Sequence, residues 1–108
     1  LLTSIDAGPL GLDFDPAGCV FAGLQAPAVL RELHELVQHV QVRDGIRTVE
    51  GAGVETAVGL GDVAWDEFLA TLAESDYRGW LTLRRTGGDD LAGDVGRGLQ
   101  YVRNVLAG

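Results

Sequence analysis

Cysteine is almost absent from this sequence, since Cys19 is the only one among 108 residues. A single cysteine forms no disulfide within the chain and cannot build a cysteine-cluster metal site. This sparse use of cysteine fits a reducing compartment, so we expect the protein in the cytoplasm. Cys19 itself is interpreted as a small packed residue.

Basic residues are also scarce. Eight of them stand against 16 acidic residues, for a formal net charge of −8. Such a chain repels phosphate backbones and anionic membrane surfaces, and it has no basic stripe for counterion release. No apolar run approaches the roughly 20 residues that span a bilayer. The sequence therefore predicts neither a nucleic-acid partner nor a membrane partner.

The opening residues, Leu1 to Ile5, include no initiator methionine and no basic targeting segment. We therefore expect a piece of a longer protein. The length fits one domain, and 46% hydrophobic residues allow a substantial core.

Hydrophobic periodicity and turn chemistry divide the chain into alternating strands and helices. Strands are predicted at 10–14, 39–42 and 77–84, and helices at 27–37, at 65–75 and from an N-cap at Asp89 to Leu106. Residues 15–18 are predicted as a turn and residues 45–64 as a long loop. Alternating strands and helices require crossovers, so the fold class is α/β with a parallel sheet of three βα units.

Each predicted strand has one apolar and one largely polar face. In the first strand, Leu12 and Phe14 lie opposite Asp13 and Asp15. The second strand sets its two valines against His39 and Gln41, and the third sets its leucines against Trp80, Thr82 and Arg84. Open doubly wound sheets have apolar strands on both faces, so this pattern favours a closed barrel with its helices outside and a polar lumen. Asp15, Gln41 and Arg84 fall at the carboxyl ends of the strands, where barrel enzymes place their chemistry.

Four short motifs carry a family resemblance. They are Leu12-Asp-Phe-Asp15-Pro-Ala, His39-Val-Gln41-Val-Arg43-Asp44-Gly, Gly59-x-Gly61-Asp-Val-x-Trp65 and Gly79-Trp-Leu-Thr-Leu83. In order and spacing they resemble the C-terminal part of the xylose isomerase-like TIM barrels, the sugar phosphate isomerase/epimerase superfamily. The resemblance implies a partial (β/α)8 barrel, with residues 1–108 as its C-terminal segment and the three strands as strands six to eight.

The resemblance also implies a metal site. In this family a divalent metal, Mg²⁺ or Mn²⁺, is commonly held by acids on strands five, six and eight and a histidine on strand seven. The metal polarises the sugar carbonyl while carboxylates move a proton. Asp15 matches the strand-six aspartate. Gln41 stands at the histidine position, as it does in hydroxypyruvate isomerases, and a carboxamide oxygen still ligates a hard cation.

Arg84 stands where the family has its strand-eight glutamate. A guanidinium neither binds a metal nor moves a proton, so no catalytic residue is assigned with certainty. A cation in a lumen needs a partner, and we expect an ion pair between Asp15 and Arg84 in place of the metal. This chain is therefore expected to hold no metal of its own, although the longer parent could hold one.

Several residues keep two interpretations. Asp15 is either a site carboxylate or a structural Asp-Pro turn, and Gln41 either a lumen hydrogen-bonding residue or a metal ligand. His39 is either a packed lumen histidine or a substrate contact. Asp44 either orients an active-site group or closes a strand-end turn. With Arg84, the last two are the candidate substrate-binding residues.

The glycine-rich segments give weaker signals. Gly59 and Gly61 have no following lysine and are interpreted as loop geometry. Gly87-Gly88 could cradle a phosphate before the last helix, but Asp89 and Asp90 oppose an anion there.

The leading hypothesis is a sugar isomerase/epimerase-like segment with a degraded metal site, which binds a sugar or polyol without turning it over. The alternative is a metal-dependent sugar or hydroxypyruvate-type isomerase, active in the full-length chain. A structural or interaction module is the third possibility. Three strands alone leave unpaired edges, so the isolated chain is expected to self-associate or to pair with further barrel strands.

Overall fold

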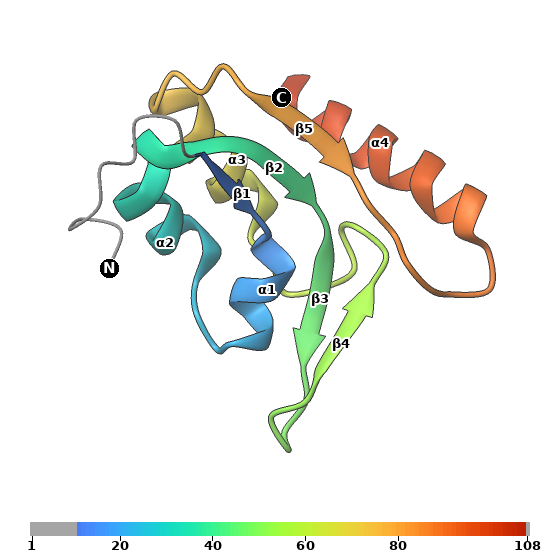
Figure 1. The fold of residues 1–108 in the computed structure, drawn as a ribbon. Helices are drawn as coiled ribbons and strands as arrows, with labels where there is room; N and C mark the ends of the chain where they lie inside the picture. The colour runs from blue at the N-terminus through green and yellow to red at the C-terminus, as the bar shows by residue number, and fades with distance from the viewer. Residues whose placement is uncertain (1–10, 108) are drawn as a thin grey trace.

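A three-stranded parallel sheet lies at the centre of the computed structural model, which describes residues 11–107 (Figure 1). Its strands are β1 (Leu12–Phe14), β2 (Val37–Val42) and β5 (Trp80–Leu83), in the order β1-β2-β5. The parallel sheet expected from the alternation of elements is confirmed. Leu10, the expected first residue of the first strand, lies outside the described residues.

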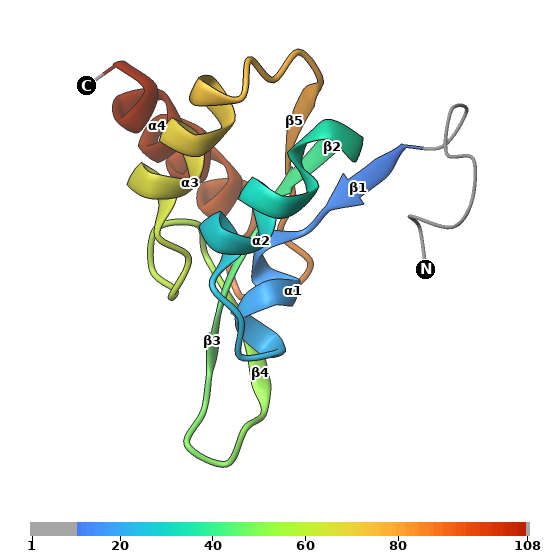
Figure 2. The same cartoon turned by 90° about the vertical axis from the view of Figure 1, so that its left-hand side faces the viewer.

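The helices gather on one side of this sheet. They are α1 (Pro16–Phe21), α2 (Ala26–Leu33), α3 (Trp65–Glu74) and α4 (Leu91–Ala107), with a 3₁₀ turn, η2, at His34–Leu36. Figure 2 shows α2, α3 and α4 on the same side of β1, β2 and β5. Within residues 11–107 no helix or strand covers the opposite face, so the sheet is one-sided in the part of the chain that is described.

Two local predictions about the first half of the chain are wrong. The segment after β1 is a helix rather than a turn, because Pro16 sits in the first helical turn, where its fixed φ fits and its missing N–H costs nothing. The next helix ends at Leu33 rather than Val37. Val37 already pairs with Leu12 in the sheet and is buried, and a β-branched residue suits that position.

The segment predicted as a long loop contains an antiparallel hairpin. Strands β3 (Asp44–Arg47) and β4 (Gly53–Thr56) pair, with Asp44 opposite Thr56. Gly51 adopts a φ of +87° at the tip, a conformation that favours glycine, and the neighbouring Val49 is 99% exposed. A side chain at Gly45 or Gly53 would collide with the ring of Phe21 from α1, so these glycines let the hairpin pack on α1.

The core lies between the sheet and its helices. Phe14 and Val40 from the sheet meet Phe68 and Trp65 from α3, with ring centroids of Phe14 and Phe68 5.5 Å apart and those of Trp65 and Phe68 5.7 Å apart. Phe68 is fully buried, as the apolar stripe of this helix predicts. The expectation that the apolar strand faces turn toward the helices is confirmed for β1 and β2. In β5, Leu81 is still 39% exposed.

The last helix begins one residue later than predicted from an N-cap at Asp89. Leu91 is its first residue, and Asp90 rather than Asp89 caps it by accepting a hydrogen bond from Gly93 N at 3.1 Å. None of the helices described between residues 11 and 107 is long and apolar enough to cross a membrane.

Candidate functional site

Five polar side chains line the uncovered face of the sheet, and we call them the polar face. They come from all three strands and from the residue that follows β5: Asp13, His39, Gln41, Thr82 and Arg84. Register places His39 beside Asp13 and Gln41 beside Thr82. The alternation read from the sequence therefore put the correct residues on the same face.

The polar face is connected by hydrogen bonds across the strands. The Gln41 amide donates from Nε2 to Asp13 Oδ2 at 2.6 Å, and its Oε1 accepts from Arg84 at 3.1 Å. His39 Nε2 lies 2.7 Å from Thr82 Oγ1, and its Nδ1 lies 3.4 Å from Asp13 Oδ1. These contacts orient the five side chains relative to one another. The hydrogen bonds among them are exposed to solvent.

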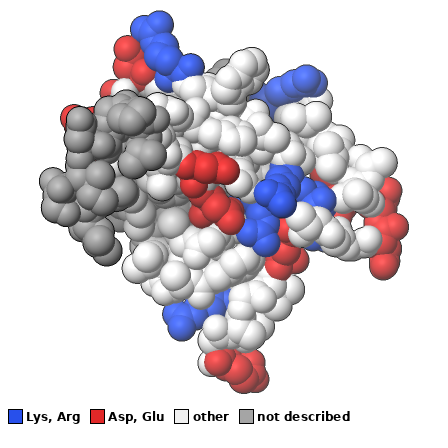
Figure 3. Space-filling view, viewed as in Figure 1, with Lys and Arg blue, Asp and Glu red and all other residues white. Residues whose placement is uncertain are grey.

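The charges on this side of the molecule are mixed. Figure 3 shows acidic and basic side chains next to one another over the middle of the face seen in Figure 1, without a broad area of one sign. A surface of this kind suits a small ligand with several donors and acceptors better than a long polyanion.

Asp15 does not pair with Arg84, so the predicted ion pair is wrong. Its Oδ2 accepts from Arg43 at 2.8 Å, and its Oδ1 is buried without a hydrogen-bond partner among the described residues. The reason is strand order. Arg43 follows β2, the strand next to β1 and Asp15, whereas Arg84 follows β5, two strands away and roughly 10 Å across the sheet.

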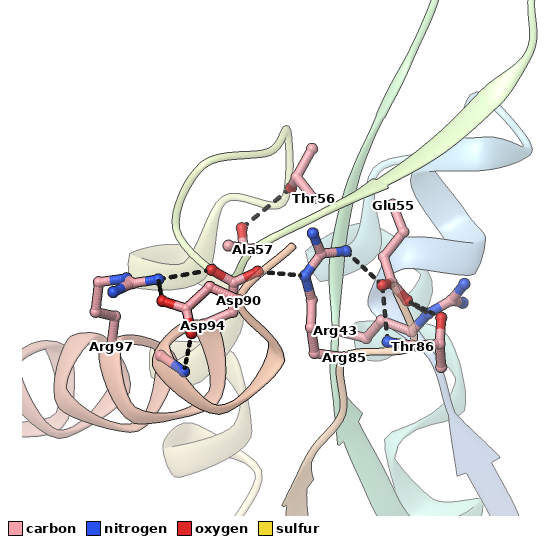
Figure 4. Close-up of polar contacts among 10 residues, drawn as sticks. Arg43, Glu55, Thr56, Ala57, Arg85, Thr86, Asp90, Asp94 and Arg97 are labelled. Atoms are coloured by element: carbon pink, nitrogen blue, oxygen red, sulfur yellow. Dashed lines mark hydrogen bonds and ion pairs between the residues drawn. The ribbon is translucent and has the colours of Figure 1, made fainter. Parts of the chain in front are cut away.

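Beyond the strand ends lies a second set of charges, the charge network. It alternates carboxylates and guanidiniums in the order Asp15, Arg43, Glu55, Arg85, Asp94, Arg97 and Asp90. Figure 4 shows how Arg43 and Arg85 point toward Glu55 from opposite sides, while Asp94 and Arg97 extend the network along α4. The network thereby joins the ends of β1, β2 and β5 to the hairpin and to α4.

Glu55 on β4 is the centre of this network. Its carboxylate accepts from Arg43 at 2.8 Å and from Arg85, Thr86 N and Thr86 Oγ1 at 2.6 to 2.9 Å. Burial alone would raise the pKa of Glu55, but the bonds from Arg43, Thr86 and Arg85 outweigh it and hold the pKa at about 2. Sequence reasoning missed Glu55, because the hairpin that carries it was predicted as a loop.

Asp44 is almost completely buried, with 1% of its surface exposed. Its carboxylate accepts five hydrogen bonds from its own chain, donated by Gly45 N, Gly59 N, Gly61 N, Val63 N and Trp65 Nε1 at 2.8 to 3.2 Å. This geometry favours a structural aspartate that fixes the loop before α3. A substrate contact through Asp44 stays a prediction, and it would have to displace these donors.

The two glycines of the Gly59-x-Gly61 motif are explained by Asp44. Gly59 has a φ of +95°, and a side chain at Gly61 would collide with the Asp44 carboxylate. Both residues let backbone amides approach the buried carboxylate, so their interpretation as loop geometry is supported.

The candidate metal ligands Asp15 and Gln41 do not suit a divalent cation. The Gln41 oxygen, a candidate metal ligand, already accepts from Arg84, and Asp15 shares its carboxylate with Arg43. Two permanent cations, Arg84 and Arg43, thus occupy the two candidate ligands Gln41 and Asp15, and of these two side chains only Asp15 Oδ1 has no hydrogen-bond partner among the described residues. Across the described chain no three His, Cys, Asp or Glu side chains cluster as metal ligands.

No protein-family model matches the chain. It is 28% identical over 97 residues to inosose dehydratase 2 of Bacillus cereus (strain ZK / E33L), an alignment that covers 77% of this chain and 33% of that protein. Among solved structures, a xylose isomerase domain protein from Planctomyces limnophilus is 28% identical, with a TM-score of 0.86 over 96% of this chain and 40% of that one.

Two more distant structures share the fold. A D-tagatose 3-epimerase-like protein aligns with 98% of this chain and 38% of its own, at 19% identity and a TM-score of 0.78. The mannonate dehydratase of Streptococcus suis serotype2 aligns with 88% of this chain and 31% of its own, at 16% identity and a TM-score of 0.70. The chain therefore spans well under half the length of the proteins that it matches, and over that part it is similar to the xylose isomerase-like TIM barrels.

Proposed function

We propose that this chain contributes strands six to eight of a xylose isomerase-like barrel, and that its polar face binds the hydroxyl groups of a sugar or polyol. Residues 1–108 are then the C-terminal segment of the barrel domain, in a cytoplasmic protein. In that arrangement the polar face turns into the lumen, at the carboxyl ends of the strands, where barrels bind their ligands. The relatives at 28% identity are named for xylose isomerase and inosose dehydratase, which supports a polyhydroxylated ligand.

One observation carries the proposal that the metal site is degraded. The Gln41 carboxamide is fixed between Asp13 and Arg84, with its oxygen turned to a guanidinium. An oxygen that accepts from a permanent cation is a poor ligand for a second cation. Because Arg84 also replaces the proton-moving glutamate of the family pattern, binding without turnover is the function that this geometry supports best.

The remaining groups of the polar face suit hydroxyl recognition. Thr82 and the His39 ring both donate and accept, Asp13 accepts, and Arg84 donates. Such groups bind the alternating donors and acceptors of a polyol, and Trp80, 79% exposed on the same side of β5, offers an aromatic surface to the apolar face of a sugar.

Calorimetric titration of Mn²⁺ into the intact protein tests the degraded site. We expect no stoichiometric binding that depends on Asp15, and the Asp15→Asn variant should give the same titration as the parent. Tight stoichiometric binding of Mn²⁺ that Asp15→Asn abolishes would instead establish the alternative, a metal-dependent isomerase with a further acid elsewhere in the barrel.

Solvent isotope exchange separates binding from catalysis. A proton-moving isomerase exchanges a carbon-bound hydrogen of its substrate with solvent. In D₂O we expect no deuterium in fructose or hydroxypyruvate after incubation with the intact protein, while polyols still raise its melting temperature. Deuterium incorporation would contradict the binding role, and absence of any polyol effect would favour a purely structural module.

We also propose that the 108-residue chain on its own associates through its sheet edges or pairs with further barrel strands. Within the described residues β1 and β5 each have one unpaired edge, and Trp80 is largely exposed beside one of them. Sedimentation of the isolated chain should show concentration-dependent association. A single monomeric species with a cooperative melt would contradict this.

A further inference from the structure

Three arginines stand at the ends of the strands, and they differ in their partners. Arg43 is held between Asp15 and Glu55, and Arg85 between Glu55 and Asp94, each by short ion pairs. Arg84 makes its hydrogen bond to a neutral amide, that of Gln41, and within residues 11–107 no carboxylate lies within ion-pair distance of it. It is also solvent-exposed, whereas the side chains of Arg43 and Arg85 are 22% and 12% exposed.

The Arg84 guanidinium is nevertheless oriented. The Gln41 amide donates to Asp13, and this bond leaves its oxygen pointing at Arg84. One of the five N–H groups of Arg84 is used in this way, and the fork of the guanidinium remains for another acceptor. Asp13, Gln41 and Arg84 thus form a line across the three strands that ends in an oriented cation.

An oriented guanidinium without a carboxylate partner matches a carboxylate of the ligand. We propose, on the basis of the proposed function, that Arg84 makes the polar face selective for a sugar acid, with the ligand carboxylate bound bidentately by Arg84. A carboxylate carries one negative charge, and its two oxygens fit the guanidinium fork. Phosphate carries a larger negative charge than a carboxylate. A single cation on a chain of net charge −8 neutralises less of that charge, so the site suits a carboxylate better.

The hydroxylated part of the ligand then lies along β5 toward Thr82. Two residues along a strand span roughly 6.6 Å, which is about the length of an extended chain of six carbons. At that distance Thr82 and His39 are next to each other and provide a hydroxyl and an imidazole to the ligand hydroxyls. The Asp13 carboxylate stays in contact with Gln41 and His39. It lies on β1, one strand farther from the ligand carboxylate than His39.

The experiment compares two probes that differ in one group. D-gluconate and D-glucitol are both open six-carbon polyols, and only gluconate carries a carboxylate. Calorimetry on the intact protein at low salt should give a dissociation constant about 10- to 100-fold lower for gluconate. The preference should weaken as salt screens the exposed charge.

Variants locate this preference at Arg84. In Arg84→Gln the ratio of the two dissociation constants should fall close to one, because gluconate binding weakens far more than glucitol binding. Arg84→Lys should retain part of the ratio because it keeps the charge but loses the fork. Arg31→Gln is the matched control, since Arg31 is an exposed arginine paired with Glu67 between α2 and α3. It should leave the ratio unchanged, and all three variants should melt within a few degrees of the parent.

The outcomes separate this inference from the proposed function. Equal binding of gluconate and glucitol, or a preference that survives Arg84→Gln, overturns the selectivity and leaves the polyol-binding function standing. Binding of neither probe overturns both. Tighter binding of glucitol 6-phosphate than of gluconate would assign Arg84 to a phosphate and overturn the sugar-acid class.

Discussion

The polar face and the charge network contain the same kinds of side chain but use them differently. In the network, Glu55 is surrounded by donors of its own chain, and its side chain is 11% exposed. On the polar face, the carboxylate, imidazole and guanidinium are exposed and only partly used by one another. Buried, saturated charges hold the fold, whereas exposed and oriented ones are available to a ligand. The following substitutions test this distinction.

Asp44→Asn should have the largest effect. The substitution turns one accepting oxygen into a donor that faces backbone N–H groups, and it leaves several of the five donors around Asp44 unpaired in a buried place. We expect a loss of about 3–5 kcal/mol in the free energy of unfolding. Denaturant unfolding monitored by far-ultraviolet circular dichroism measures it. Asp62→Asn, an exposed neighbour in the same loop, is the matched control and should change little.

Glu55→Gln should lower the free energy of unfolding by less than Asp44→Asn, but still measurably. The variant removes the charge between Arg43 and Arg85 while keeping the shape, so we expect a loss of about 2–3 kcal/mol. Glu50→Gln at the exposed hairpin tip is its control. A loss equal to that of the control would mean that the network does not stabilise the fold.

Lowering the pH should gradually remove the contribution of ionised Glu55 to the stability of the fold. The pKa of Glu55 is about 2 in the folded chain, below the ordinary 4.5, so the folded state holds the deprotonated form. Its contribution to stability is fully present above the ordinary pKa and is lost as the pH falls toward 2. The difference in unfolding free energy between the parent and Glu55→Gln should therefore be constant above pH 5 and shrink below it. A difference that stayed constant down to pH 2 would contradict the depressed pKa.

Thr82→Val on the polar face should have the smallest effect. It removes the hydrogen bond to His39 in exposed surroundings, keeps the shape of the side chain and suits a strand, so we expect a change within about 0.5 kcal/mol. Unfolding in urea measures it, and a loss as large as that of Glu55→Gln would remove the distinction between the two regions.

The fold could be predicted from the sequence where one physical rule dominates. Alternation along three strands correctly put His39 with Thr82 and Gln41 with Asp13 on one face, because a strand turns each successive side chain to the opposite side. Strand order decided the outcome for Asp15, which pairs with Arg43 on the neighbouring strand rather than with Arg84. The prediction considered only whether Arg84 could reach Asp15, and it left out Arg43, which follows the neighbouring strand.

Local sequence patterns could not predict the hairpin or the roles of its two carboxylates, Asp44 and Glu55. Glycines gave residues 45–64 the composition of a loop, although Gly45 and Gly53 are needed for packing on Phe21. The role of Glu55 depends on Arg85, 30 positions away, and that of Asp44 on amides 15 to 19 positions away. Such contacts depend on the assembled fold, so neither residue could be assigned its role from its neighbours in the sequence.

The exposed hairpin tip makes the chain easy to label. Val49 is far more accessible than Cys19, whose pKa is raised by burial and by the charge of Asp15, so the native thiol reacts slowly. A cysteine introduced by Val49→Cys would therefore take a maleimide dye first. A fluorophore at this tip would stand at a position that carries none of the proposed binding groups.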